Sequence, residues 1–316
     1  MFYQRIRNLV SLAKYKYRTN KNKVISTICI ICICSFIIAI VPKNLRIYFI
    51  DVGQGDSTLI ITPLNKKILI DGGGTEFGDY NVGEKTLMPY LLARRIRKID
   101  YIIISHFDTD HCQGLLYIMQ EMKVKNVIIG KQYEENENYR KFVNIIKEKN
   151  IKVKVVEAGS RISIERNLYF DVLWPDSDNI ITQNAINNNS LVCKLVYKKF
   201  SILFTGDIEE IAEKAIIAKY KNQLKSTVLK VAHHGSKTSS TMEFINAVNP
   251  KYALIGVGKD NKFGHPADIT IQDLEAKNIQ IYRTDEMGEV TINIKNLTKR
   301  EKNVIIKRSC SKKGDW

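Results

Sequence analysis

At 316 residues, the chain is long enough to bury a core in one large domain or two modest ones. Apolar residues make up 44% of the sequence and charged residues 26%, proportions that exclude wholesale disorder. The formal net charge of +16 predicts attraction to polyanions: nucleic acid, anionic lipid or anionic cell-wall polymer.

The chain begins with a basic segment followed by an apolar one. Residues 1–23 hold seven Lys and Arg side chains and no acidic residue, which leaves a net charge of +9 on the remainder. Residues 24–41 carry no charge, and eighteen residues are near the lower limit for a helix that crosses a bilayer. We therefore expect a basic cytoplasmic arm at 1–23 and an uncleaved transmembrane anchor at 24–42, with the rest of the chain outside the cell membrane. A buried core helix and a cleaved signal peptide are the alternatives.

Short β-branched runs alternate with helical patterns in the rest of the chain. The predicted strands cover 45–52, 57–62, 67–71, 101–105, 126–129, 152–156, 161–164, 168–173, 191–197, 201–205, 227–231 and 252–256. The predicted helices cover 82–97, 112–122, 138–149, 209–220, 241–247 and 269–277.

A polar, Asn-rich stretch at 176–189 separates two β-rich halves, each with helices on one side only. We interpret this stretch as the crossover between two sheets that pack face to face. The expected fold class is α/β: an αββα four-layer sandwich over 44–296, preceded by the transmembrane helix and followed by a basic tail at 297–316.

All five histidines fall in three short loops, which follow predicted strands or Gly-rich turns. Histidines used only for packing would be spread through the elements, whereas a metal site on a rigid scaffold requires such clustering. The five are His106, His111, His233, His234 and His265.

The first loop combines two histidines with two aspartates. His106, Asp108 and Asp110 alternate along a segment that continues a strand, so their side chains can converge, and His111 begins the next helix. Four N and O donors can serve two adjacent divalent ions, for which Zn²⁺ and Mn²⁺ are suited. The alternative is a loop whose aspartates cap the following helix beside solvated histidines.

Three further segments offer candidate ligands. Asp207 ends a buried strand and could bridge two ions, or only cap the following helix. His233 and His234 follow a strand and should point in opposite directions, so that one binds metal and the other faces substrate; which of them does so stays open. Asn189 could offer an amide oxygen, or belong to a polar turn.

His265 stands in a Gly-His-Pro turn ahead of a predicted helix. Because a helix N-terminus attracts anions, this histidine could hold a phosphate or protonate a leaving oxygen. A loop histidine without a role is the alternative.

Together these loops resemble the metallo-β-lactamase superfamily, whose signature is His-x-His-x-Asp-His. Asp108 replaces the second histidine, as in the metal-dependent domain of ComEC-type competence proteins, which act in DNA uptake. The resemblance covers about residues 45–294. It extends to Asp51-Val-Gly-Gln-Gly-Asp-Ser57, Leu69-Ile-Asp-Gly-Gly73, Asn188-Asn-Ser190, Thr205-Gly-Asp207 and the His-His-Gly-Ser and Gly-His-Pro segments.

The resemblance implies a dinuclear hydrolase. His106 and Asp108 would bind one metal, and Asp207 would lie between the two ions. The second metal would be bound by Asp110, His111 and either His233 or His234. Among the supporting residues, Asp71 would orient ligands, and Asp56 and Ser57 would lie near the mouth of the site.

The expected function is that of a membrane-anchored phosphodiesterase or nuclease acting on DNA outside the membrane. Two metals supply a nucleophile at neutral pH and stabilise charge on a phosphate, and the basic outer part attracts polyanions. We expect Asp110, His233 and His265 to act closest to the reacting phosphate. The alternatives are a hydrolase of teichoic-acid or phosphocholine phosphodiesters and a non-catalytic DNA-binding receptor.

Overall fold

The computed structural model describes residues 2–40, 43–75, 78–295 and 304–308, and the chain divides into two compact units at residues 43 and 44. The first unit holds helices α1 (Phe2–Thr19) and α2 (Lys21–Ile40). Among the described residues, no helix combines the length and the apolar character that a membrane crossing requires. The anchor expected at 24–42 is therefore not confirmed, and its residues 41 and 42 lie outside the described part.

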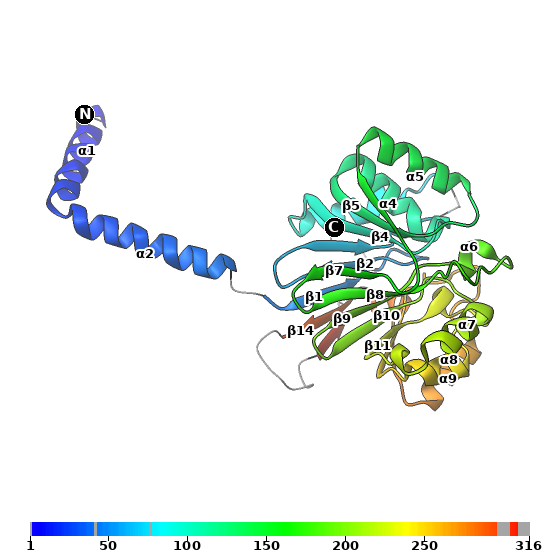
Figure 1. Cartoon of the computed structure of the whole chain (residues 1–316). Helices are drawn as coiled ribbons and strands as arrows, with labels where there is room; N and C mark the ends of the chain where they lie inside the picture. The colour runs from blue at the N-terminus through cyan, green and yellow to red at the C-terminus, as the bar shows by residue number, and fades with distance from the viewer. Residues whose placement is uncertain (1, 41–42, 76–77, 296–303, 309–316) are drawn as a thin grey trace. The chain divides into compact units, whose positions relative to one another are not determined.

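The second unit contains two mixed sheets (Figure 1). The eight-stranded sheet has the order β15-β14-β1-β2-β3-β4-β5-β6, in which β3 to β6 are parallel. Its strands are β1 (Leu45–Phe49), β2 (Thr58–Ile61), β3 (Lys67–Ile70), β4 (Lys98–Ile104), β5 (Lys123–Gly130), β6 (Lys152–Val156), β14 (Val290–Ile294) and β15 (Val304–Arg308).

The seven-stranded sheet has the order β13-β12-β11-β10-β9-β8-β7, and its strands β10 to β13 are parallel. Its strands are β7 (Arg161–Glu165), β8 (Leu168–Trp174), β9 (Val192–Tyr197), β10 (Phe200–Phe204), β11 (Val228–Lys230), β12 (Tyr252–Ile255) and β13 (Gln280–Arg283).

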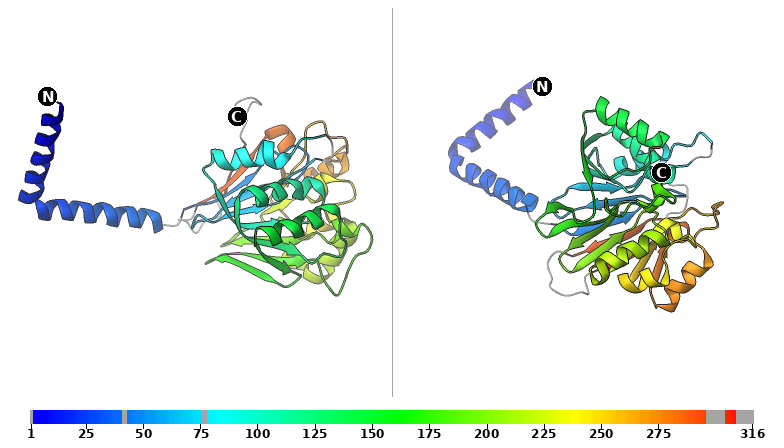
Figure 2. Two further views of the ribbon diagram at one scale, coloured as in Figure 1. Left: turned by 90° about the horizontal axis from the view of Figure 1, so that it is seen from above. Right: turned by 45° about the vertical axis from the view of Figure 1, so that its right-hand side comes forward.

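Helices cover the outer faces of both sheets (Figures 1 and 2). The short π-helix η1 (Gly83–Leu87) and helices α3 (Met88–Ala93), α4 (Thr109–Glu121) and α5 (Glu137–Glu148) share an apolar cluster with the first sheet. Helices α7 (Glu210–Tyr220), α8 (Met242–Val248) and α9 (Asp268–Ala276) do so with the second sheet. The remaining short elements are α6 (Ala185–Asn188), η2 (Lys221–Leu224), η3 (Ala232–Gly235) and α10 (Thr284–Met287).

A third apolar cluster lies between the two sheets and includes Ile47, Phe49, Phe170 and Leu195. Most strands are therefore buried on both faces, which explains their nearly continuous Ile, Val and Leu content. Three apolar interfaces separate four layers, so the second unit is the expected helix–sheet–sheet–helix sandwich.

The crossover between the sheets is not where the composition suggested. Residues 176–189 connect β8 to β9, which are antiparallel neighbours in the same sheet. The chain changes sheets between β6 and β7, across a turn of four residues. A tight turn carries little composition signal, whereas the long Asn-rich connection stands out in the sequence because most of its residues are polar.

Two further boundaries differ from prediction. The helix expected over 82–97 ends at Ala93, because Arg95 adopts a φ of 58° and the amides of Arg95 and Ile96 donate to carbonyls of the last turn. The tail expected at 297–316 contributes an edge strand, β15, and its other residues lie outside the described part.

Candidate metal centre

The candidate site lies at the carboxyl ends of the central parallel strands, where open α/β sheets bind their ligands. Asp71 follows β3, and the segment from Ser105 to Asp110 follows β4. From the second sheet, Asp207 follows β10 and the two-histidine turn follows β11. The two sheets thus bring together residues that are more than 100 positions apart in the sequence.

The candidate ligands fall into two groups. The more compact group, which we call the second half of the centre, consists of Asp110, His111 and His234. The His111 Nε2 atom lies 3.1 Å from His234 Nε2, and His234 Nε2 lies 3.1 Å from the Asp110 carboxylate. Asp207 completes the cluster at 3.2 Å from His111 Nε2 and 3.4 Å from His234 Nε2. These atoms converge on one point from three separate loops.

The far nitrogens of both rings are committed to acceptors. His234 Nδ1 donates to the carbonyl of Gly256 at 2.7 Å, and His111 Nδ1 donates to Asp71 at 3.0 Å. A carbonyl or carboxylate held this way fixes the ring orientation and turns Nε2 toward the cluster. Such a partner behind each histidine is typical of metal-binding imidazoles.

Charge within the cluster also favours a cation. Burial lowers the pKa of His234, but Asp207 and Asp56 raise it to about 10, and Asp207 likewise raises the pKa of His111. Burial would raise the pKa of Asp207, yet the two histidines hold it well below its usual range. The buried carboxylates therefore require compensating positive charge. Without a metal, protons on the two histidines supply it; bound divalent ions would supply it in their place.

The first half, which we define as His106 and Asp108, is looser. His106 Nε2 lies 3.7 Å from the Asp108 carboxylate and 4.0 Å from Asp207. This nitrogen is buried without a hydrogen-bond partner among the described residues, while Nδ1 lies 2.9 Å from the Ser105 hydroxyl. Asp108 is more open, with 39% of its side chain exposed, and occupies the N-cap position of α4 without making a capping bond.

Burial, together with the neighbouring His111, lowers the pKa of His106 to about 3. A neutral imidazole with a buried, unpaired Nε2 is the form that binds metal. Asp207, 4.0 Å from His106 and 3.4 Å from His234, lies between the two halves.

The two-histidine turn resolves which histidine belongs to the metal cluster. His233 and His234 both have left-handed backbone conformations, with φ values of 50° and 53°. His234 is buried in the cluster, whereas His233 keeps 23% of its side chain exposed, with Nε2 3.9 Å from Asp207. The alternation expected of a strand end does not apply to this turn, although the two rings do take different roles.

Asn189 does not contribute to the cluster. Its amide nitrogen donates to the carbonyls of Ile181 and Ala185, and its amide oxygen accepts from the Ile181 amide. Both ends of the side chain are thus used to close the loop that precedes β9, which corrects the prediction of an Asn189 ligand. Asn187 differs, because its buried side-chain oxygen has no hydrogen-bond partner among the described residues.

Asp56 and Ser57 lie beneath the cluster instead of at its mouth. Asp56 faces the Nδ1 side of both cluster histidines, at 3.9 Å from His111 and 3.8 Å from His234. Asp56 lies close enough to join the cluster of possible ligands, but its carboxylate is on the far side of both rings and is paired with Lys230. The Ser57 hydroxyl donates to the backbone carbonyl of Asp71 and so supports that turn.

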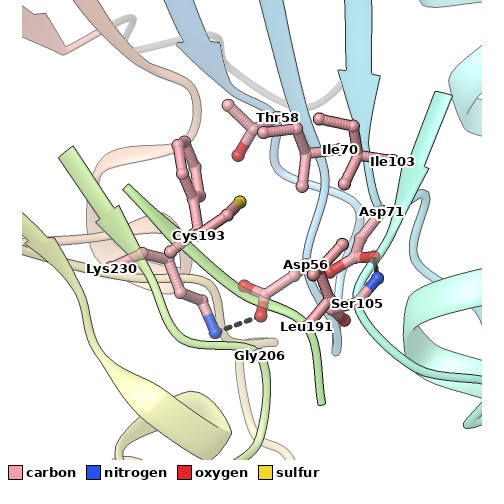
Figure 3. A pocket seen from close by; sticks show the side chains of 11 residues that line it. Asp56, Thr58, Ile70, Asp71, Ile103, Ser105, Leu191, Cys193, Gly206 and Lys230 are labelled. Atoms are coloured by element: carbon pink, nitrogen blue, oxygen red, sulfur yellow. Dashed lines mark hydrogen bonds and ion pairs between the residues drawn. The ribbon is translucent and has the colours of Figure 1, made fainter. Parts of the chain in front are cut away.

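Lys230 lies beside the cluster and was not predicted from the sequence. It lies on β11 with its ammonium group buried between the sheets, in an ion pair with Asp56 (Figure 3). The pair borders a pocket of about 10 Å³ that Asp71 and Ser105 also line, which is far too small for a substrate. The available signal was a single lysine within an otherwise apolar strand.

His265 stands beside the cluster without joining it. Its ring is 5.7 Å from that of His233, and burial together with His234 and His233 lowers its pKa to about 4. A neutral imidazole can still donate a hydrogen bond to a phosphate oxygen, so the roles of His265 as general acid or phosphate ligand stay predictions.

The residues fit a two-metal site. Buried atoms without hydrogen-bond partners among the described residues include His106 Nε2 and Asp207 Oδ1, one near each half. Imidazole nitrogens and carboxylate oxygens in this mixture suit zinc, manganese or iron. His106 and Asp108 would hold one ion, Asp110, His111 and His234 the other, and Asp207 could serve both.

The chain is similar to known proteins over the region that holds this cluster. The family described as the metallo-beta-lactamase superfamily matches residues 50–259. ComE operon protein 3 of Bacillus subtilis (strain 168) is 33% identical over 281 residues, which are 84% of this chain and 36% of that protein. Competence protein ComA of Neisseria gonorrhoeae is 29% identical over 255 residues, covering 80% of this chain and 33% of that protein.

The chain thus spans about a third of the length of these curated relatives. Among solved structures, CmlA, a diiron beta-hydroxylase from Streptomyces venezuelae, matches with a TM-score of 0.51 at 13% identity, over 80% of this chain and 54% of that chain. At that identity the likeness concerns the fold alone.

Proposed function

Because the chain belongs to the metallo-beta-lactamase superfamily, we propose that its metal centre hydrolyses phosphodiesters and that its substrate is DNA. Its relatives include ComEC-type competence proteins, and a buried cluster of possible metal ligands lies in the matched region. The family match and the ligand cluster support a metal-dependent hydrolase, whereas the phosphodiester and the DNA are our proposal.

One observation carries the proposal: Nε2 atoms of two histidines and oxygens of two aspartates converge within 3.1–3.4 Å, with both histidines oriented from behind. Bound divalent ions would lower the pKa of water and stabilise the charge that develops on a phosphate during in-line attack. The chain's own contribution is to fix the ligand geometry through Asp71 and Gly256 and to keep the ligands out of bulk solvent.

His233 is the residue best placed to contact a substrate. Its Nε2 is 3.9 Å from Asp207, its Nδ1 has no hydrogen-bond partner among the described residues, and part of the ring is exposed. An imidazole in that position can donate to a non-bridging phosphate oxygen and orient the phosphodiester beside both halves of the centre.

Charge and kinship support DNA as the polyanion. The chain has a net charge of +16, and proteins of this kind bind phosphate backbones with strong salt dependence. The name of one of these relatives, Competence protein ComA, refers to competence. A part in DNA uptake is our proposal for this chain, which covers only a third of those proteins.

Substitution of a ligand tests the activity. We expect Asp110→Ala to abolish DNA cleavage in the presence of Mn²⁺ or Zn²⁺ while the circular dichroism spectrum stays unchanged. Asp178→Ala, which removes an exposed carboxylate from the connection before β9, should cleave like the unmodified chain. Undiminished cleavage by Asp110→Ala would overturn the assignment of the centre.

Parallel substrates test the choice of DNA. Plasmid, single-stranded DNA and a choline-phosphate ester should be offered to the same preparation, and faster turnover of the ester would favour a cell-wall phosphodiester. Binding of DNA by a chain that contains less than one equivalent of metal and cleaves nothing would favour a DNA-binding receptor.

We also propose that the hydrolase domain acts outside the cytoplasm and that the first unit associates with the membrane. The support is the basic composition of 1–23 followed by the uncharged stretch 24–41. Protease digestion of intact cells should cut the domain if the proposal holds, and a domain protected until lysis would contradict it.

A further inference from the structure

We propose that Phe263 forms a stacking platform for an unpaired nucleobase of the strand whose phosphate enters the metal centre. The inference rests on the proposed function and adds to it a subsite that recognises bases. Phe263 is 57% exposed, a large fraction for a phenylalanine within a folded domain. It belongs to the loop between β12 and α9, which also carries His265.

Three aromatic rings lead from this platform to the centre. The ring of Phe263 stacks on that of His265, with centroids 5.9 Å apart and an interplanar angle of 19°. His265 in turn lies edge to face against His233 at 5.7 Å, and His233 Nε2 is 3.9 Å from Asp207. A base on the outer face of Phe263 would therefore extend the Phe263–His265 stack, whose inner ring contacts His233 beside the proposed phosphate position.

The loop holds the exposed ring in place. The Asn261 side-chain oxygen accepts from the amides of Phe263 and His265, and its nitrogen donates to the carbonyls of Gly258 and His265. A preorganised aromatic ring loses little conformational freedom when a ligand stacks on it. Four hydrogen bonds from one side chain thus stabilise a loop whose tip exposes an apolar ring.

Contacts at both ends of the loop tie it to the catalytic loops. The Gly258 amide donates to the side chain of Gln54, and the Ala267 amide donates to the Gly235 carbonyl of the two-histidine turn. Gly258 also packs so closely on the Gln54 backbone that an added Cβ would lie 2.6 Å from its nitrogen. The platform is therefore fixed relative to His233 and His234.

Charge around the ring selects a nucleotide over the other ligands that stack on aromatic rings. The loop carries Lys259, Asp260 and Lys262, and the chain as a whole is strongly basic. A quaternary ammonium group, the other common partner of an exposed aromatic face, would be repelled by this surplus of positive charge. A nucleotide joins a flat base to an anionic phosphate and satisfies both features.

The test compares strands with and without bases. Binding of fluorescein-labelled oligothymidylate and of an abasic oligomer of equal length, both with phosphorothioate linkages that resist cleavage, is measured by anisotropy with Mn²⁺ present. The full chain should bind the thymidylate strand more tightly than the abasic strand. Phe263→Leu should lower the affinity for the thymidylate strand by about 10-fold and leave the affinity for the abasic strand unchanged. Phe263→Trp should retain the preference.

Leu64→Ala is the matched control, since Leu64 is also 57% exposed but lies in the turn before β3, at the opposite end of that strand from Asp71. Equal affinity of the unmodified chain for both strands, or an equal loss for both in Phe263→Leu, would overturn the platform. Base-dependent binding without cleavage of ordinary DNA would instead overturn the proposed function and leave the platform in place.

Discussion

The two halves of the metal centre differ in how firmly the protein holds them. In the second half, each histidine has a partner behind it: Asp71 for His111 and the Gly256 carbonyl for His234. In the first half, His106 rests on a neighbouring hydroxyl, and Asp108 is 39% exposed. The second half is preorganised by hydrogen bonds behind both histidines, whereas the first half joins a buried histidine to a partly exposed aspartate.

This difference indicates a division of labour. A metal held by oriented, buried ligands should bind tightly and remain in place, whereas an ion held by His106, Asp108 and the shared Asp207 should exchange more readily. The replacement of a second histidine by Asp108 in the signature fits that interpretation, because an exposed carboxylate holds a transition metal less firmly than a buried imidazole. Substitutions in each half should therefore have different effects.

The largest effect should come from Asp207, the residue common to both halves. Asp207→Asn removes a charge near both ions, so we expect kcat/KM for DNA to fall by about 1000-fold or more, with less than two metal equivalents per chain. Asp178→Asn serves as the control for loss of a carboxylate. Two retained equivalents and near-normal cleavage would mean that Asp207 does not serve both ions.

Lys230 tests the electrostatic support of the second half. Lys230→Met leaves Asp56 buried without its ion pair, and we expect the free energy of unfolding in urea to fall by about 3–5 kcal/mol. Addition of Asp56→Asn should recover part of that loss, because the uncompensated charge is then gone. A loss below about 1 kcal/mol for the single variant would show that Asp56 finds another partner.

Asp71 and Asp108 separate the two halves directly. Asp71→Asn removes the carboxylate that accepts from His111. We expect the affinity for the more tightly bound metal to fall about 10- to 100-fold in a competition titration. Asp108→Asn should lower only the affinity for the more weakly bound metal. If both variants weakened the same ion, the distinction between the halves would be wrong.

The smallest effect concerns Glu213, which supports the segment after the two-histidine turn by accepting from the amides of Ser240 and Thr241. Burial raises the pKa of Glu213 from 4.5 to about 7. Since the folded state binds this proton more tightly, its contribution to stability is present below pH 4.5 and is lost as the pH rises to about 7.

We expect Glu213→Gln to remove a pH-dependent change on the order of 2 kcal/mol in urea titrations between pH 4.5 and pH 8. Glu275→Gln, an exposed change on α9, should leave the pH dependence as it is. An unchanged profile in Glu213→Gln would assign the dependence to the metal centre.

The sequence was sufficient to predict the four layers and most of the metal cluster, because both depend on periodic or local signals. Continuous apolar runs marked the buried strands, and histidines confined to three loops marked the centre. His111 and Asp207 were identifiable because each directly follows or begins a predicted element.

The predictions that failed concerned features that depend on backbone conformation and on contacts between distant segments. The choice between His233 and His234 required their left-handed φ values, which no alternation rule supplies. Asn189 closes a loop through three hydrogen bonds, and Asp56 is drawn inward by Lys230 from the other sheet. Pairings across the two sheets leave no trace in local spacing.

The pairing of β1 with β14 limits how early the first sheet can fold during synthesis. Leu45 is the register partner of Ile294, so the first strand of the domain lies beside one that is translated about 250 residues later. A nascent chain can form β1 and β2 early, but the other edge of β1 stays uncovered until β14 has left the ribosome. We therefore expect folding of this sheet to finish late, and its open edge to be the part of the nascent chain most exposed to wrong pairing or to capture by a chaperone.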